Sequence, residues 1–103
     1  MHKFVVLYNH PEDPDHFRSY YESTHVPLAA ALPGLKAWRY SFDVASPGQA
    51  DPPYFCIFEG EFESAEAMGQ ALGSEQGQKV GADVANYASG GATILTYPIT
   101  AGS

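Results

Sequence analysis

Four short apolar segments of the chain are predicted to be β-strands, and in one of them, residues 35–42, the side chains alternate with the two-residue period typical of a strand. The segments are residues 3–8, 35–42, 54–62 and 93–99, and each is rich in aromatic or β-branched side chains. Residues 43–53 between the second and third segments are dense in Pro, Gly, Ala and Asp, and we expect a loop there.

A long amphipathic helix is predicted between the first two strands, over about residues 14–32. Asp13 followed by Pro14 is typical of an N-cap with proline at the first helical position. Pro33 and Gly34 would end the helix. Apolar or aromatic side chains recur at helical spacing through it, at Phe17, Tyr20, Tyr21, Leu28 and Leu32.

A second helical region follows the third strand. Ser64 is placed to cap a helix over about residues 65–72, Gly73-Ser74 interrupts it, and the pattern resumes up to Tyr87. The order of elements is therefore βαββαβ, which predicts a single α+β domain over residues 1–103. Its fold would be ferredoxin-like, with a four-stranded antiparallel sheet.

The first and third strands are apolar on both faces, so one face of the sheet would be bare in a monomer. Phe4, Val6 and Tyr8 alternate with Val5 and Leu7 in the first strand. Two helices cover only one sheet face, and a large bare apolar patch is unusual on a soluble monomer. We therefore expect a homodimer formed sheet to sheet.

Composition excludes several classes of partner. Twelve acidic residues against five basic ones give a net charge of −7, which disfavours nucleic acid and anionic membranes. Cys56 is the sole cysteine, so no intramolecular disulfide or cysteine-based metal site can form. No glycine-rich phosphate loop is present, and we expect no cofactor and no metal. The short N-terminal apolar run does not resemble a signal peptide, which predicts a cytoplasmic protein.

His25 is the first candidate for chemistry. It lies at the edge of the apolar stripe of the first helix, with Tyr21 and Leu28 as neighbours on the same face. An imidazole can exchange protons near neutral pH, although a packed, hydrogen-bonded histidine would fit the same position. Pro27 would disturb the helix nearby and so shape a pocket, or simply end the helix early.

Asp83 is the natural partner for His25, because both helices of this fold cover the same sheet face. A carboxylate there would fix the tautomer of the ring, whereas the alternative is a solvated acid on the helix surface. Trp38, Tyr40 and Tyr87 belong to an unusually large aromatic inventory, most of it expected in the core. We take these three, with Tyr21 and Leu28, as candidates for the pocket wall.

The segment FRSYYESTHVPL at residues 17–28, followed by LPGL at 32–35, resembles the signature of the EthD family, within the dimeric α/β-barrel superfamily. The stretch 78–91, with Asp83 and Tyr87, resembles that family too. The resemblance implies a homodimer, a pocket on each helical face, and a part in the catabolism of small organic compounds such as ethers. His25 corresponds to the motif histidine.

Three functions fit this resemblance. In the first, His25 is a general acid or base for a small oxygenated apolar or aromatic molecule, and Asp83 orients it. In the second, the protein is a non-catalytic carrier or accessory for a P450-type oxygenase. The third is a cofactor-free oxidoreductase resembling the monooxygenases of the superfamily. One fold hosts many functions, so the sequence leaves these open.

Overall fold

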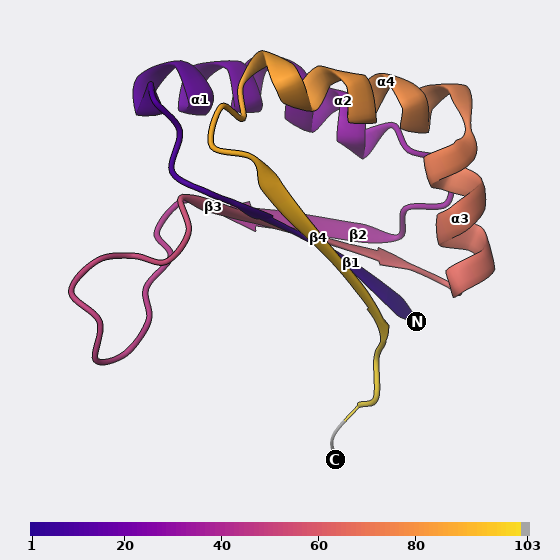
Figure 1. The fold of residues 1–103 in the computed structure, drawn as a ribbon. Helices are drawn as coiled ribbons and strands as arrows, with labels where there is room; N and C mark the ends of the chain where they lie inside the picture. Colours follow the sequence, from indigo (N-terminus) through magenta and orange to yellow (C-terminus); the bar gives the residue numbers. More distant parts are fainter. Residues whose placement is uncertain (102–103) are drawn as a thin grey trace.

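The computed structural model describes residues 1–101 as a four-stranded antiparallel sheet with all of its helices on one face (Figure 1). The strands are β1 (His2–Tyr8), β2 (Ala37–Ser41), β3 (Cys56–Phe62) and β4 (Ala92–Pro98). The helices are α1 (Pro14–Tyr20), α2 (Val26–Ala30), α3 (Ala65–Gly73) and α4 (Glu75–Asp83), with the short segments η1 (Tyr21–His25) and η2 (Val84–Asn86). The predicted ferredoxin-like α+β fold is confirmed.

The sheet has the order β2-β3-β1-β4, so β1 lies in its interior and β2 and β4 form its edges. In β1, Val6 pairs with Phe58 of β3 and with Ile94 of β4. Paired residues in an antiparallel sheet share a face. The side chains of Phe4, Val6 and Tyr8 therefore face the helices, and those of their neighbours face away.

Short polar side chains begin the helices as the sequence predicts. The carboxylate of Asp13 accepts from the backbone N–H of His16 at 3.1 Å, with Pro14 in the first turn of α1. The hydroxyl of Ser64 accepts from the N–H of Ala67 at 3.1 Å at the start of α3. These bonds satisfy backbone donors that a helix leaves free at its N-terminus.

The predicted helix over residues 14–32 runs continuously from Pro14 to Ala30, but its middle is a wider turn. Its α-helical turns end at Tyr20, η1 continues as a π-helical turn, and α2 begins at Val26 beside Pro27. The N–H of Val26 bonds to the carbonyl of Tyr21, five residues back. Pro27 has no N–H to continue the α-helical ladder. The wide turn takes up one extra residue just before Pro27 and lets the helix go on.

The second helical region is two helices that meet at a corner. Ser74 ends α3 and caps α4, with its hydroxyl accepting from the N–H of Gly77 at 3.1 Å. A Cβ at Gly77 would collide with the backbone carbonyls of Ala71 and Leu72. The corner therefore depends on glycine at residue 77, and it sets the direction in which α4 runs back over the sheet.

The core lies between the helices and the sheet. Phe17, Tyr21, Phe62 and Cys56 are fully buried there. Burial raises the pKa of the Cys56 thiol to about 12, so it stays protonated and packs as an unreactive core residue. No helix within residues 1–101 is long and apolar enough to cross a membrane.

Candidate functional site

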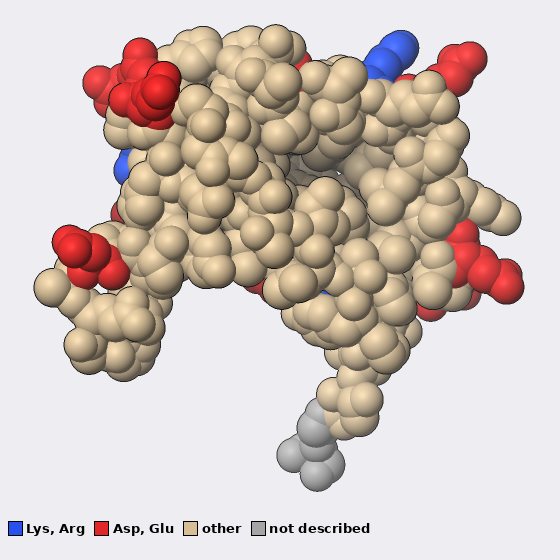
Figure 2. Space-filling model, in the orientation of Figure 1, with Lys and Arg blue, Asp and Glu red and all other residues tan. Residues whose placement is uncertain are grey.

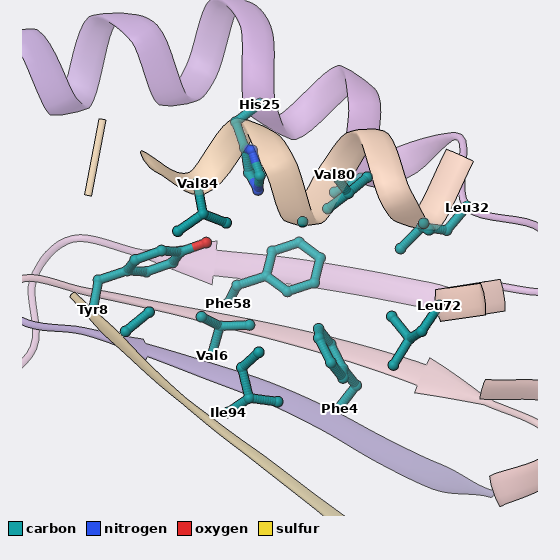
Figure 3. A pocket seen from close by; sticks show the side chains of 14 residues that line it. Phe4, Val6, Tyr8, His25, Leu32, Phe58, Leu72, Val80, Val84 and Ile94 are labelled. Atoms are coloured by element: carbon teal, nitrogen blue, oxygen red, sulfur yellow. The ribbon is translucent and has the colours of Figure 1, made fainter. Parts of the chain in front are cut away.

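A cavity of about 460 Å³ lies between the helices and the sheet. This volume falls in the usual range of small-molecule sites. Strands β1, β3 and β4 form its floor, and α2, α3 and α4 form its walls (Figure 3). Its wall consists of Phe4, Val6, Tyr8, His25, Ala29, Leu32, Phe58, Leu72, Gly77, Val80, Gly81, Val84, Ala92 and Ile94. Only Tyr8 and His25 among them carry a polar side chain.

His25 enters this cavity from the end of the π-helical turn, and its ring points inward (Figure 3). The ring stacks on Tyr21 with centroids 5.5 Å apart and contacts Tyr87 at 4.6 Å. A π-helix has more residues per turn than an α-helix, so residues four apart, such as Tyr21 and His25, stay nearly in line. The π turn thus brings His25 from the edge of the stripe to a buried position, 3% exposed.

The Nδ1 atom of His25 lies 2.9 Å from Oδ2 of Asp83, which is 8% exposed. Asp83 is the partner predicted for His25, and the two helices bring the groups together. The other carboxylate oxygen, Oδ1, accepts from the hydroxyl of Tyr20 at 2.5 Å and from the amide of Asn86 at 3.0 Å. Asp83 is therefore held from three sides.

The hydrogen bonds decide the charge of the carboxylate. Burial alone would raise the pKa of Asp83, but the bonds from Tyr20, Asn86 and His25 outweigh it and lower the pKa below its ordinary value. Asp83 is therefore ionised at neutral pH and acts only as an acceptor.

Burial lowers the pKa of His25 below its ordinary value, and the hydrogen bond and charge of Asp83 oppose this only in part. The ring is therefore neutral at pH 7. Its Nδ1–H donates to Asp83, which leaves the lone pair of Nε2 toward the cavity. Within residues 1–101, no protein group forms a hydrogen bond with Nε2. The arrangement offers a bound molecule one basic nitrogen.

Tyr8 provides the second polar atom of the cavity. Its hydroxyl shares a hydrogen bond of 2.7 Å with the hydroxyl of Tyr87. Burial raises the pKa of Tyr8 to about 12 and that of Tyr87 further still, so both stay protonated. This bond uses only one of the two hydroxyl hydrogens, so the other hydrogen remains available. When Tyr87 donates to Tyr8, the hydrogen of Tyr8 is free for a ligand.

The other candidates for the pocket wall lie around the cavity rather than on it. The buried Tyr21 and Tyr87 support the ring of His25 from behind. Leu28 is half-buried, and its carbonyl accepts from the side-chain amide of Gln76. Trp38 and Tyr40 stack on one another on β2, Trp38 is 41% exposed, and neither borders this cavity. Their part in binding stays a prediction.

Sequence reasoning missed Tyr8 and Tyr20 as members of the site. The alternation of β1 does place Tyr8 as the one polar tip on an otherwise apolar face, which is a usable signal. Tyr20 was noticed only as an aromatic residue. Its bond to Asp83 depends on how α1 and α4 pack, and no spacing in the sequence reports that.

Residues 9–91 match the EthD domain. The chain belongs to the EthD family. An uncharacterized 11.0 kDa protein from the thcB–thcC intergenic region of Rhodococcus erythropolis is 41% identical over 96 residues, 92% of this chain and 91% of the relative. The predicted family membership is confirmed.

Two solved structures are similar to this chain over nearly its whole length. An ethyl tert-butyl ether degradation family protein from Bacillus halodurans is 28% identical, with a TM-score of 0.89 over 97% of this chain and 99% of that one. A dimeric ferredoxin-like protein of unknown function from Thermobifida fusca is 15% identical, with a TM-score of 0.71 over 95% and 90% of the two chains. The second likeness concerns the fold alone.

Proposed function

We propose that this EthD family protein binds a small, neutral, largely apolar molecule that carries one oxygen function, and that His25 acts on it as a general base. One observation carries the proposal. The basic Nε2 of a neutral, Asp83-bound imidazole meets an otherwise apolar cavity, with only the Tyr8 hydroxyl as a second polar group. No Asp, Glu, Lys or Arg of the described chain lines the cavity, which favours an uncharged ligand.

The chemistry follows from the proton positions. A ligand O–H donates to Nε2 of His25, and transfer of that proton gives an imidazolium and a ligand oxyanion. The ionised Asp83 stabilises the imidazolium through Nδ1–H. When Tyr87 donates to Tyr8, the hydrogen of Tyr8 would stabilise the oxyanion. An aromatic or aliphatic alcohol would meet these requirements.

We place this binding in the catabolism of small organic compounds. The Bacillus halodurans structure is named for ethyl tert-butyl ether degradation, and this chain shares its family and nearly its whole fold. Cleavage of an ether yields an alcohol, so a cavity that accepts an alcohol suits such a sequence of reactions. Ether degradation is therefore part of the proposal for this chain.

We further propose a homodimer formed by the sheet face away from the helices. Val5 and Leu7 of β1 share that face with their register partners Leu95 and Ile57. Leu95 is 47% exposed, and Tyr97 beyond it is 44% exposed. Burying such a patch against a second copy removes apolar surface from water. The Thermobifida fusca protein of the same fold is itself dimeric.

The binding proposal is tested with two ligands of nearly equal size, 2-naphthol and its methyl ether, 2-methoxynaphthalene. Only the naphthol can donate to Nε2, so the wild-type protein should bind it about tenfold more tightly by isothermal titration calorimetry. The substitution His25→Phe keeps a ring but removes the acceptor, and the preference should vanish. The control His2→Phe alters the start of β1, away from the cavity, and should keep it.

Thermal melting of each variant shows whether the fold persists. Equal affinity of the wild-type protein for the two ligands would refute the role of His25 as an acceptor. So would a preference that survives in a folded His25→Phe variant.

A further inference from the structure

The cavity has a mouth on one side, between α4 and β4. Of the residues that line it, three are exposed, namely Gly81 of α4 and Ala92 and Ile94 of β4. Ile94 is 58% exposed although its side chain lies on the helix-facing side of the sheet. Figure 2 shows a hollow in this face of the molecule, with uncharged residues around it. A ligand would therefore enter past Gly81, Ala92 and Ile94.

Gly81 has no packing reason to be glycine. A Cβ built at this position meets no atom within 4 Å. Its φ is not positive either, so its backbone conformation suits any residue. Glycine is among the poorest helix formers, and Gly81 lies within α4. The space that its missing side chain leaves open is part of the cavity mouth.

Gly77, one turn earlier, gives the contrast. It lies on the same cavity-facing stripe of α4, but a Cβ there would collide with the α3 backbone, so packing alone explains it. Val80 and Val84 fill the rest of the stripe with branched side chains. A Cβ at residue 81 meets no clash in the empty protein, and a larger side chain built on it would narrow the entrance.

We propose that Gly81 sets the width of the ligand that the cavity admits, so that this helix position determines size specificity. The inference rests on the proposed binding of a small oxygenated molecule. It adds a prediction about the shape of the ligand: the part of the ligand that lies in the mouth is too broad to fit beside any side chain at residue 81. A compact ligand such as phenol should pass a narrowed mouth, and a two-ring ligand such as 2-naphthol should not.

The experiment compares dissociation constants for phenol and 2-naphthol in the wild-type protein and in Gly81→Ala, Gly81→Leu and Gly69→Leu. Gly69 is the matched control, because it is an exposed helical glycine of α3 whose Cβ also meets nothing within 4 Å, and it does not line the cavity. The preference for 2-naphthol over phenol should fall about tenfold in Gly81→Leu and less in Gly81→Ala. It should be unchanged in Gly69→Leu.

The outcomes separate the two proposals. If the wild-type protein binds both phenols and Gly81→Leu keeps the wild-type preference, Gly81 does not control width and the binding function stands. If the preference for 2-naphthol fell by the same factor in Gly69→Leu, the effect would not arise at the cavity mouth, and the role of Gly81 would be refuted. If the wild-type protein binds neither phenol, the proposed function fails, and the inference about Gly81 fails with it. Thermal melting checks that each leucine variant is folded.

Discussion

The carboxylate of Asp83 fixes the tautomer of His25 because its two oxygens have different hydrogen-bond partners. Oδ1 accepts from Tyr20 and Asn86, and Oδ2 faces Nδ1 of the ring. An ionised carboxylate accepts only, so the hydrogen must sit on Nδ1 and the lone pair on Nε2. The lone pair of Nε2 therefore faces the cavity as a result of the bonds that Asp83 makes to Tyr20, Asn86 and Nδ1 of the ring.

Replacing the carboxylate by an amide should reverse that tautomer. In Asp83→Asn the amide oxygen stays toward the donors Tyr20 and Asn86, and its NH₂ then faces Nδ1 of His25. The ring must accept at Nδ1 and carry its hydrogen on Nε2, which can donate to the oxygen of 2-naphthol or of 2-methoxynaphthalene, so the roughly tenfold preference for 2-naphthol should be lost. Nitrogen NMR of the imidazole reads the tautomer directly. A wild-type preference with an unchanged tautomer would contradict this account, and Asp15→Asn on α1 is the exposed control.

The stability of the protein should decline in acid in two stages. The folded-state pKa of His25 is lowered, so the unfolded chain binds the proton more tightly, and the free energy of unfolding falls as the pH drops below about 6.5. The pKa of Asp83 is also lowered, and the stability that it adds is lost at still lower pH. Urea unfolding at a series of pH values measures both stages.

A variant isolates the first of these stages. His25→Phe should show no loss of stability from this position as the pH falls below about 6.5, whereas His2→Phe should keep the wild-type profile. An identical profile in all three proteins would show that burial does not lower the pKa of His25.

The role of a single residue could be predicted from the sequence where its side chain is chemically distinct from its neighbours. It could not be predicted where it depends on how two helices pack. His25 and Asp83 are predictable because the spacing shows an imidazole on one amphipathic helix and an acid on the other. The bond from Tyr20 to Asp83 spans 63 residues and depends on the packing of α1 against α4. Trp38 and Tyr40 were chosen for their aromatic rings, and the cavity runs toward β4, away from the β2 edge that carries them.

The π-helical turn η1 is a local feature of an element that the sequence pattern does not predict. Apolar spacing over residues 14–32 correctly predicts helix, and Pro27 correctly marks a disturbance. Periodicity does not tell a broken helix from one widened by a single residue. The widened turn keeps the helix continuous from Pro14 to Ala30 and turns His25 inward, where a regular helix leaves it at the edge. Such turns are frequent at functional sites, and this one positions the candidate base.

The corner between α3 and α4 should tolerate no side chain at residue 77. In Gly77→Ala the new methyl group meets the backbone carbonyls of Ala71 and Leu72, which cannot rotate away, so the corner must open. We expect a loss of about 2 kcal/mol in the free energy of unfolding. Gly69→Ala, in open space on α3, should instead add about 0.5–1 kcal/mol. Urea unfolding compares them, and equal effects would contradict this view of the corner.

The topology of the whole domain was predictable because each strand and helix is marked by its own periodicity, and the order βαββαβ admits few arrangements. The cavity was not predictable in its position or volume. A hollow is the space that packed side chains leave, and here it depends on the exposed β4 edge and on the missing side chain at Gly81. Hydropathy shows which residues are apolar, but it does not show which apolar side chains leave a space between them in the folded protein.

Two adjacent residues of β4 test which face of the sheet forms the proposed dimer. Leu95 lies on the face away from the helices, and Ile94 lies on the cavity side, with both side chains about half exposed. Sedimentation equilibrium at micromolar concentration should give about twice the chain mass of 11.1 kDa for the wild-type protein. Leu95→Asp would bury a charge between the sheets and should give the monomer mass. Ile94→Asp places the same charge on the other face and should remain dimeric, so dissociation of Ile94→Asp alone would assign the interface to the opposite face.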